Sequence, residues 1–284
     1  MNGVILGRFM PPHTGHLFLI DFARSMVDRL YVLVCTLESE PIPGDVRYRW
    51  VRELAPNCTV IHITEENPAA ARGQTGATGI WADTVRKAVP EGITHVFASE
   101  DYGWDLAYLL EAQFVPVDTN RSNIPVSASM IRENPYRYWQ YIPPPVRPWF
   151  LRHVAVVGLP EVAAHLAQAL GTVVVHPYQE FWRTTWNSFA GHLDIKPLSP
   201  EMIQRGAASA AGALARQANR LLIHDVRTVA AVSALKPDLV VAELEVQNEL
   251  ADLLSGTAAG FDAPLIVSPA QVNPENLAGM LGIS

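Results

Sequence analysis

The chain has 284 residues, of which 49% are hydrophobic, enough for two domains with separate cores. Its formal net charge is −7 and no basic stripe runs along it, so we expect no nucleic-acid partner. No apolar run approaches the roughly 18–20 residues that a membrane span needs, and the N-terminus lacks the pattern of a secretory signal, so we expect no membrane association and a cytoplasmic location. Two isolated cysteines, Cys35 and Cys58, indicate neither a disulfide framework nor a Cys-rich metal site.

The first half of the chain alternates between short apolar segments and amphipathic segments. Segments that are apolar on both faces predict buried parallel strands at 3–6, 29–36, 59–63, 95–98 and 114–117. Helical patterns cover 17–26, 47–54, 80–88 and 106–111. This alternation predicts a doubly wound parallel sheet, in which ligands bind beyond the carboxyl ends of the strands. We therefore expect the segments that follow the strands to share one rim: 7–16, 36–40, 63–67 and 99–102.

The segment after the first strand carries the strongest functional signal. Residues 7–16 read Gly-Arg-Phe-Met-Pro-Pro-His-Thr-Gly-His. A helix that begins near Gly15 places His16 in its first turn and His13 just before it, where free backbone N–H groups favour an anion such as phosphate. Gly7 and Gly15 let the backbone approach closely, and imidazole N–H groups would stabilise charge that builds on a phosphate under attack. The alternative is an ordinary turn with surface histidines, which this coincidence of features disfavours.

A proline-rich segment, Tyr-Ile-Pro-Pro-Pro-Val-Arg-Pro-Trp at 141–149, divides the chain. Proline removes backbone donors, so this segment predicts a semi-rigid connector and not a continuous helix. We place one domain at 1–145 and a second at 151–284. In the second domain, predicted strands at 153–157, 172–176, 220–224, 239–244 and 264–267 again alternate with helical patterns, as at 162–170 and 204–219. The predicted fold class is therefore α/β, with two doubly wound parallel-sheet domains.

The second domain begins as a phosphate-binding loop would, with an apolar strand followed by Gly158. Laid from Gly158, the pattern Gly-x4-Gly-Lys-Ser/Thr puts Ala163, Ala164 and His165 at the last three defined positions. The lysine that reaches the nucleotide phosphates and the hydroxyl that holds Mg²⁺ are both missing. Asp225 is either a remnant acid or a solvated aspartate at a strand end. We predict a degenerate P-loop without kinase activity.

These motifs resemble a known family. The segment 7–16 is similar to the signature of the H-x-G-H nucleotidyltransferases, and Val-Ser-Ala-Ser-Met-Ile-Arg at 126–132 is similar to their second signature. The segments Glu-Pro-Ile-Pro-Gly at 40–44, Arg-Tyr at 47–48, Ser-Glu-Asp-Tyr-Gly at 99–103, Arg-Glu-Asn-Pro at 132–135 and Tyr-Trp at 138–139 narrow the resemblance. They are similar to the bacterial bifunctional nicotinamide mononucleotide (NMN) adenylyltransferase/ribosylnicotinamide kinases, over residues 1 to about 150. The resemblance implies a Rossmann-like nucleotidyltransferase domain followed by a P-loop-kinase-like domain.

The resemblance also implies roles for particular residues. The catalytic residues are His13, His16 and Arg132, the last holding the departing pyrophosphate. The implied ATP and phosphate contacts are Gly7, Arg8, Phe9, Met10, Gly15, Ser127 and Ile131, and the implied NMN or NAD contacts are Arg47, Asn67, Trp81, Ser99, Glu100 and Val126. Some have plainer alternatives: Ser127 as a helix cap, Arg8 as a solvated side chain, Arg47 in a surface salt bridge and Trp81 in the core. As a nicotinamide contact, Trp81 would stack on the cationic ring.

The implied reaction is direct in-line transfer: ATP and NMN give NAD and pyrophosphate, in NAD biosynthesis or salvage. The implied cofactor is Mg²⁺ carried by ATP, with no protein-built metal site. Another nucleotidyltransferase, such as one acting on phosphopantetheine, is a first alternative, against which Trp81 and the segments 99–102 and 132–135 argue. A NAD-sensing or scaffold protein is a second, against which the intact His13, His16 and Arg132 argue. A homo-oligomer stays open. Because no segment precedes Met1, we do not expect the DNA-binding repressor function of some relatives.

Overall fold

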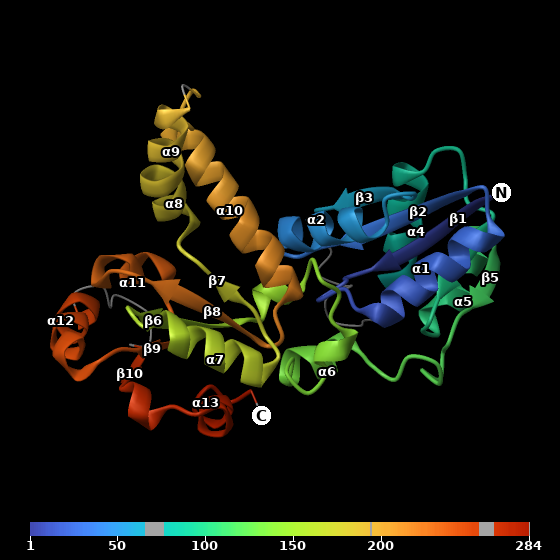
Figure 1. The fold of residues 1–284 in the computed structure, drawn as a ribbon. Helices are drawn as coiled ribbons and strands as arrows, with labels where there is room; N and C mark the ends of the chain where they lie inside the picture. The colour runs from blue at the N-terminus through green and yellow to red at the C-terminus, as the bar shows by residue number, and fades with distance from the viewer. Residues whose placement is uncertain (66–76, 194, 256–263, 284) are drawn as a thin grey trace. The chain divides into compact units, whose positions relative to one another are not determined.

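The computed structural model describes residues 1–65, 77–193, 195–255 and 264–283. The chain divides into two compact units, Met1–Val146 and Arg147–Ser284, which are described separately (Figure 1). Among the described residues, no helix combines the length and the apolar character that a membrane crossing requires.

The first unit is a parallel sheet in the order β3-β2-β1-β4-β5. The strands are β1 (Asn2–Gly7), β2 (Arg29–Cys35), β3 (Thr59–Ile63), β4 (His95–Ala98) and β5 (Gln113–Pro116). The helices are α1 (Thr14–Met26), α2 (Gly44–Leu54), α4 (Ala77–Ala88), α5 (Tyr102–Leu109) and α6 (Ala128–Glu133). The chain winds outward from β1 to β3 and then returns to β4 on the other side of β1. The predicted doubly wound sheet is confirmed, and its switch point lies between β1 and β4.

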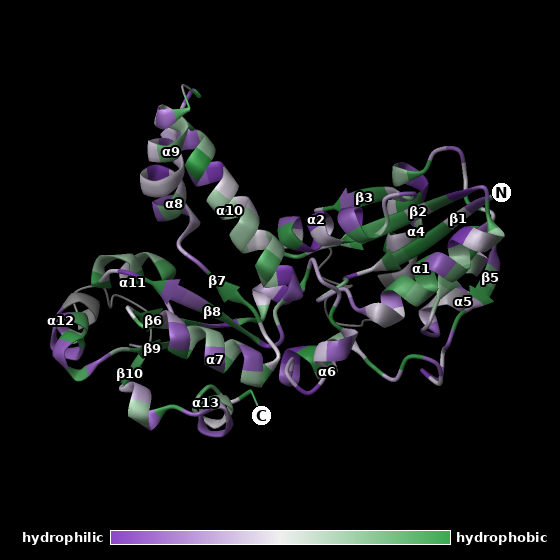
Figure 2. Cartoon of the chain, viewed as in Figure 1, coloured by the Kyte–Doolittle hydropathy of each residue, from purple (hydrophilic) through white to green (hydrophobic). Residues whose placement is uncertain are grey.

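Strands β1 and β2 are apolar on both faces because helices cover both faces of the sheet. Val4 and Leu33 belong to one buried cluster with residues of α4 and α5. Ile5 and Val32 belong to a second cluster with residues of α1 and α2. Figure 2 shows β1 and β2 as largely hydrophobic. Full burial of each such side chain contributes roughly 1.5–3 kcal/mol, so these two clusters fix the strand register.

The second unit is also a parallel sheet, in the order β10-β9-β6-β8-β7. The strands are β6 (Arg152–Val157), β7 (Val174–Val175), β8 (Leu221–Val226), β9 (Leu239–Val241) and β10 (Leu265–Val267). The helices are α7 (Pro160–Leu170), α8 (Tyr178–Phe181), α9 (Asn187–His192), α10 (Pro200–Gln217), α11 (Val229–Leu235), α12 (Leu244–Ser255) and α13 (Pro274–Met280). The alternating pattern predicted for this half is confirmed, although β7 and β9 are shorter than the predicted strands.

Between the two sheets, the proline-rich segment contains two short 3₁₀ turns, Trp139–Tyr141 and Arg147–Trp149. No continuous helix crosses it, as the prolines predict. Trp139, Ile142 and Val146 are buried, so this segment packs against the protein over much of its length.

Candidate functional site

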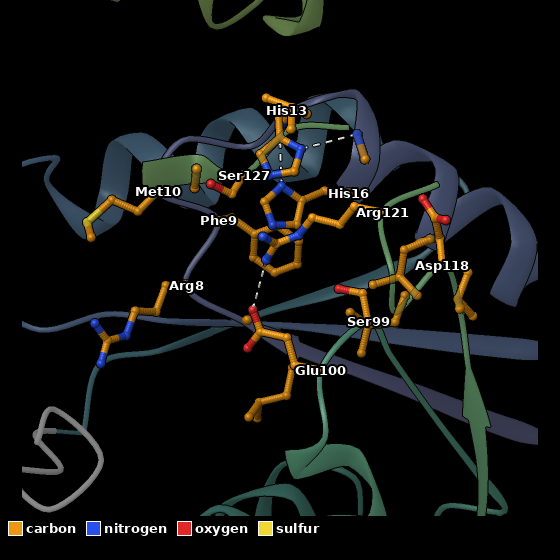
Figure 3. A pocket seen from close by; sticks show the side chains of 18 of the residues that line it. Arg8, Phe9, Met10, His13, His16, Ser99, Glu100, Asp118, Arg121 and Ser127 are labelled. Atoms are coloured by element: carbon orange, nitrogen blue, oxygen red, sulfur yellow. Dashed lines mark hydrogen bonds and ion pairs between the residues drawn. The ribbon is translucent and has the colours of Figure 1, made fainter. Parts of the chain in front are cut away.

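A cavity of about 640 Å³ lies in the first unit, a size typical of small-ligand sites. Its lining comes from the carboxyl ends of β1, β4 and β5 and from α1, α4 and α6 (Figure 3). The opening is thus next to the switch point of the sheet, where doubly wound folds bind ligands. The predicted site residues that line it are Gly7, Arg8, Phe9, Met10, His13, Gly15, His16, Trp81, Ser99, Glu100, Val126, Ser127 and Arg132.

Ile131 and Asn67 are two further predicted contacts, of which only Ile131 lies within the described residues. Ile131 is fully buried on α6 and is not part of the cavity lining. Its position supports the helix that carries Ser127 and Arg132 and offers no surface to a nucleotide. Asn67 lies outside the described residues.

Arg47 corrects a prediction, because it does not face the cavity. Its side chain is 0% exposed. The guanidinium donates to the carbonyl oxygens of Arg8 at 2.6 Å, Cys35 at 3.2 Å and Ile42 at 2.9 Å, and it pairs with Glu40. These four hydrogen bonds direct the guanidinium into the protein's interior, so neither a nucleotide phosphate nor a surface salt bridge describes its contacts. Arg47 instead joins the ends of β1 and β2 to the loop before α2.

The two histidines cap helix α1 for each other. The Nδ1 atom of His13 accepts from the backbone N–H of Gly15 at 3.1 Å, and the Nδ1 atom of His16 accepts from the backbone N–H of His13 at 3.2 Å. The helix begins at Thr14 with His13 as its N-cap, which confirms the predicted placement of both residues. The arrangement is a capping box in which imidazoles replace the usual hydroxyl and carboxylate.

This cap determines which nitrogen of each ring can serve a ligand. A neutral imidazole that accepts at Nδ1 carries its proton on Nε2. Burial lowers the pKa of His13 to about 4, and burial together with the neighbouring His13 holds the pKa of His16 well below its usual value of 6.5. Both rings are therefore neutral at pH 7. Each keeps one Nε2–H donor, and both residues line the cavity.

Gly15 lies against the ring of His13. A Cβ atom at this position would lie 3.0 Å from the Cε1 and Nδ1 atoms of that ring. A larger residue would therefore require the ring to shift by a few tenths of an ångström. The sequence predicted Gly15 as a point of close approach to phosphate, and the structure adds this second reason.

Helix α6 also lines the cavity, and Figure 3 shows Ser127 beside His13. Ser127 is its N-cap, accepting from the N–H of Met130 at 3.2 Å, so the capping role is confirmed while the residue also lines the cavity. Arg132, in the last turn, donates to the carbonyl oxygen of Met10. This bond ties α6 to the histidine segment. The predicted Arg8 is exposed and pairs with Glu40 at 3.5 Å.

Trp81 lies where the core meets the cavity, and its contact with nicotinamide stays a prediction. It lies on α4, packs against the buried cluster of the sheet and lines the cavity. Near it, Ser99 and Glu100 follow β4. Tyr102, at the start of α5, is partly buried and donates its hydroxyl to the carbonyl of Leu6 at 2.6 Å, which holds α5 against the end of β1.

Sequence reasoning missed the residues that follow β5. Asp118 and Arg121 line the cavity. The Asp118 carboxylate accepts from the backbone N–H groups of Asn123 and Ile124, both at 3.1 Å, and these bonds lower its pKa. Arg121 pairs with Glu100 at 3.6 Å across the cavity. These residues could have been found from the sequence, because they follow the predicted strand at 114–117, whose carboxyl end lies at the same rim of the sheet.

In the described part of the second unit, the connection between β6 and α7 does not form a phosphate-binding loop. Strand β6 ends at Val157 and α7 begins at Pro160, so Gly158 and Leu159 are all that separate them. A P-loop holds phosphate with free backbone N–H groups, whereas the N–H of Ala163 bonds to Leu159 within the helix at 3.1 Å. Asp225 also corrects an expectation: it is 3% exposed and pairs with His176 at 3.3 Å and Arg227 at 3.5 Å, so it is not solvated.

The comparisons with known proteins agree with this geometry. The chain is 32% identical over 175 residues to the trifunctional NAD biosynthesis/regulator protein NadR of Escherichia coli (strain K12), covering 55% of this chain and 42% of that protein. The same figures hold for NadR of Salmonella typhimurium (strain LT2). The match thus spans less than half the length of these curated relatives.

Two solved structures share the fold over most of the chain. A crystal structure of NadR in complex with NAD and AMP-PNP has a TM-score of 0.70 at 17% identity, covering 100% of this chain and 96% of that chain. A crystal structure of NadR in complex with NR has a TM-score of 0.64 at 18% identity, covering 93% and 88%. Residues 4–134 match the cytidylyltransferase-like family model, which covers the histidine cap, the cavity and α6. Through residues 4–134, the chain is therefore similar to the cytidylyltransferase-like family.

Proposed function

We propose that the first unit is a nicotinamide-nucleotide adenylyltransferase that converts ATP and NMN to NAD and pyrophosphate. The observation that carries the proposal is the histidine cap: two neutral imidazoles with fixed tautomers present Nε2–H donors to a cavity of nucleotide size. The NadR relatives support the choice of substrates, since they are named as NAD biosynthesis proteins.

In this reaction, a phosphate oxygen of NMN attacks the α-phosphorus of ATP. The bond between the α-phosphorus and the oxygen bridging to the β-phosphate breaks, and pyrophosphate leaves with those electrons. The attacking phosphate is already ionised at pH 7, so the protein need supply no general base. Its contribution is positioning, together with donors that stabilise the charge that builds on the α-phosphate oxygens. His13 and His16 provide these donors, and Arg132 is placed to hold pyrophosphate. Mg²⁺ enters this proposal as an ion carried by the ATP phosphates.

A panel of acceptors tests the assignment. The protein is incubated with ATP and Mg²⁺ and, in turn, NMN, nicotinic acid mononucleotide and 4′-phosphopantetheine, and pyrophosphate release is measured. We expect the highest kcat/KM with a pyridine mononucleotide. Faster transfer to phosphopantetheine would show that this compound, and not a pyridine mononucleotide, is the acceptor. Binding of NAD with no transfer to any acceptor would favour a sensing role.

We predict that Trp81→Ala weakens NMN and NAD binding by roughly 1–2 kcal/mol, because an indole face stabilises a cationic pyridinium ring. Trp81→Phe, which retains an aromatic face and much of the packing, should lose less. Calorimetric titration with NMN and with ATP separates the two ligands, and ATP affinity should stay within about twofold of wild type. Equal losses for ATP and NMN would instead show that Trp81 supports the cavity as a core residue.

We also predict that the second unit does not phosphorylate nicotinamide riboside, because the segment from Gly158 to His165 lacks the lysine and the hydroxyl of a P-loop. The full chain supplies its own reporter: any NMN made from the riboside would be converted to NAD. With ATP and nicotinamide riboside we expect neither ADP nor NAD, whereas NMN in the same buffer gives NAD. ATP-dependent formation of NMN that is abolished by substitutions at Gly158 would contradict the prediction.

A further inference from the structure

The proposed reaction requires positive charge at the point where two anions meet. The phosphate of NMN must approach the triphosphate of ATP to bonding distance, and like charges repel strongly in a partly dry cavity. The histidines provide hydrogen bonds but no net charge, because both are neutral at pH 7. Among the described residues that line the cavity, the cationic side chains are Arg8, Arg121 and Arg132.

These arginines lie in different parts of the cavity. Arg8 pairs with Glu40 near the loop before α2, and Arg132 is bonded to Met10 on the α6 side. Arg121 is the one beside the histidine rings. Figure 3 shows its guanidinium next to Phe9 and His16, and its charge contributes to the lowered pKa of both histidines. Its partner Glu100 lies on the β4 side, so Arg121 stands between the histidine cap and that side of the cavity.

The loop that carries Arg121 is held in an uncommon conformation. Asp118 and Arg121 have φ angles of +49° and +51°, in the left-handed region that non-glycine residues seldom adopt. The Asp118 carboxylate fixes the loop through the N–H groups of Asn123 and Ile124. Such a backbone persists only where its surroundings determine it, and it is found most often at functional sites.

We propose that Arg121 binds the phosphate of the mononucleotide acceptor and neutralises it beside the ATP α-phosphate. The inference rests on the proposed function and adds a residue that recognises the phosphate of the acceptor. Without ligand, the guanidinium is paired with Glu100, but both side chains are about half exposed or more, at 45% and 64%, so the pair is weak. A phosphate that accepts two parallel N–H bonds from the guanidinium replaces that carboxylate. Glu100 thus keeps Arg121 in place until the acceptor arrives.

The test compares two ligands that differ only in the phosphate. Binding of NMN and of nicotinamide riboside to the full chain is measured by calorimetry for wild type, Arg121→Gln and Arg121→Lys. Loss of a charge-assisted pair should weaken NMN binding on the order of 10–100-fold in Arg121→Gln, while the affinity for the riboside stays within about twofold of wild type. Lysine restores the charge but not the two parallel N–H donors of the guanidinium. The NMN affinity of Arg121→Lys should therefore lie between those of wild type and Arg121→Gln. Arg49→Gln, an exposed arginine outside the cavity lining, is the matched control.

Steady-state kinetics complete the test, with the KM for NMN expected to rise and the KM for ATP to change less than about threefold. Equal weakening of NMN and riboside, or a larger effect on ATP than on NMN, would overturn the role of Arg121. If wild type makes no NAD, the proposed function fails, and the difference between NMN and riboside binding still decides whether Arg121 recognises the phosphate.

Discussion

Replacing His16 by asparagine lowers kcat for adenylyl transfer by a factor on the order of 10²–10³, or about 3–4 kcal/mol of transition-state stabilisation. Asparagine can place its Oδ1 atom where Nδ1 of His16 accepts from the His13 N–H group. The helix cap is then retained and the Nε2–H donor is lost. Because the lost bond strengthens only as charge builds on the α-phosphate, the KM for ATP should change little.

Two further variants separate catalysis from capping. His16→Ala removes both the donor and the cap, and should lose rate together with thermal stability. His16→Gln extends an amide N–H toward the position of Nε2 and should recover part of the rate. Single-turnover measurements report the chemical step free of product release. A His16→Asn rate within about threefold of wild type would remove His16 from the mechanism.

Replacing Arg47 by methionine destabilises the first unit by about 3–5 kcal/mol, the range for breaking a buried ion pair by removing one partner. Glu40, whose side chain is 7% exposed, keeps its pairing with Arg8 at 3.5 Å but loses the buried guanidinium. The carbonyl oxygens of Arg8, Cys35 and Ile42 lose the donor that Arg47 provides. Since two-domain chains need not unfold in one step, hydrogen exchange of the β1 and β2 amides measures the loss within this unit.

Arg49→Met on the same helix is the control. Arg49 pairs with Asp45 at 3.2 Å with its side chain 64% exposed, and its loss should stay within about 0.5 kcal/mol. The double variant Arg47→Met with Glu40→Gln should be more stable than Arg47→Met alone, because it no longer holds a buried carboxylate that has lost its buried cation. If Arg47→Met instead left amide exchange unchanged and weakened the binding of ATP or NMN, the result would support the phosphate contact that the sequence predicted for Arg47.

The parts of the fold that follow local rules could be predicted from sequence. The strands of the first unit are apolar on both faces because helices cover both faces, and β3 and β4 have the predicted bounds. The placement of both histidines at the start of a helix could be predicted because it depends on only four residues, 13–16. The prediction that Trp81 contacts a ligand came from the family resemblance and not from a local rule, and the residue lines the cavity.

Features that depend on distant contacts could not be predicted in the same way. The burial of Arg47 is determined by carbonyl groups at positions 8, 35 and 42, which no spacing in the sequence relates to it. In the second unit, Trp182 lies in a π-helical turn, Trp182–Trp186, and its ring packs where a Cβ atom on Gly206 would come within 2.7 Å. Neither a helical nor a strand period marks that segment, so its helices were missed.

The central claim is that this cavity transfers the adenylyl group of ATP to NMN. The most direct measurement incubates the full chain with Mg²⁺, NMN and ATP labelled with ³²P at the α-phosphate, and follows the label and the pyrophosphate released. We expect that the label appears in NAD, that one pyrophosphate forms per NAD, and that His16→Asn slows both together. Label that stays in ATP with folded protein and saturating NMN, or that leaves ATP without entering NAD, would contradict it.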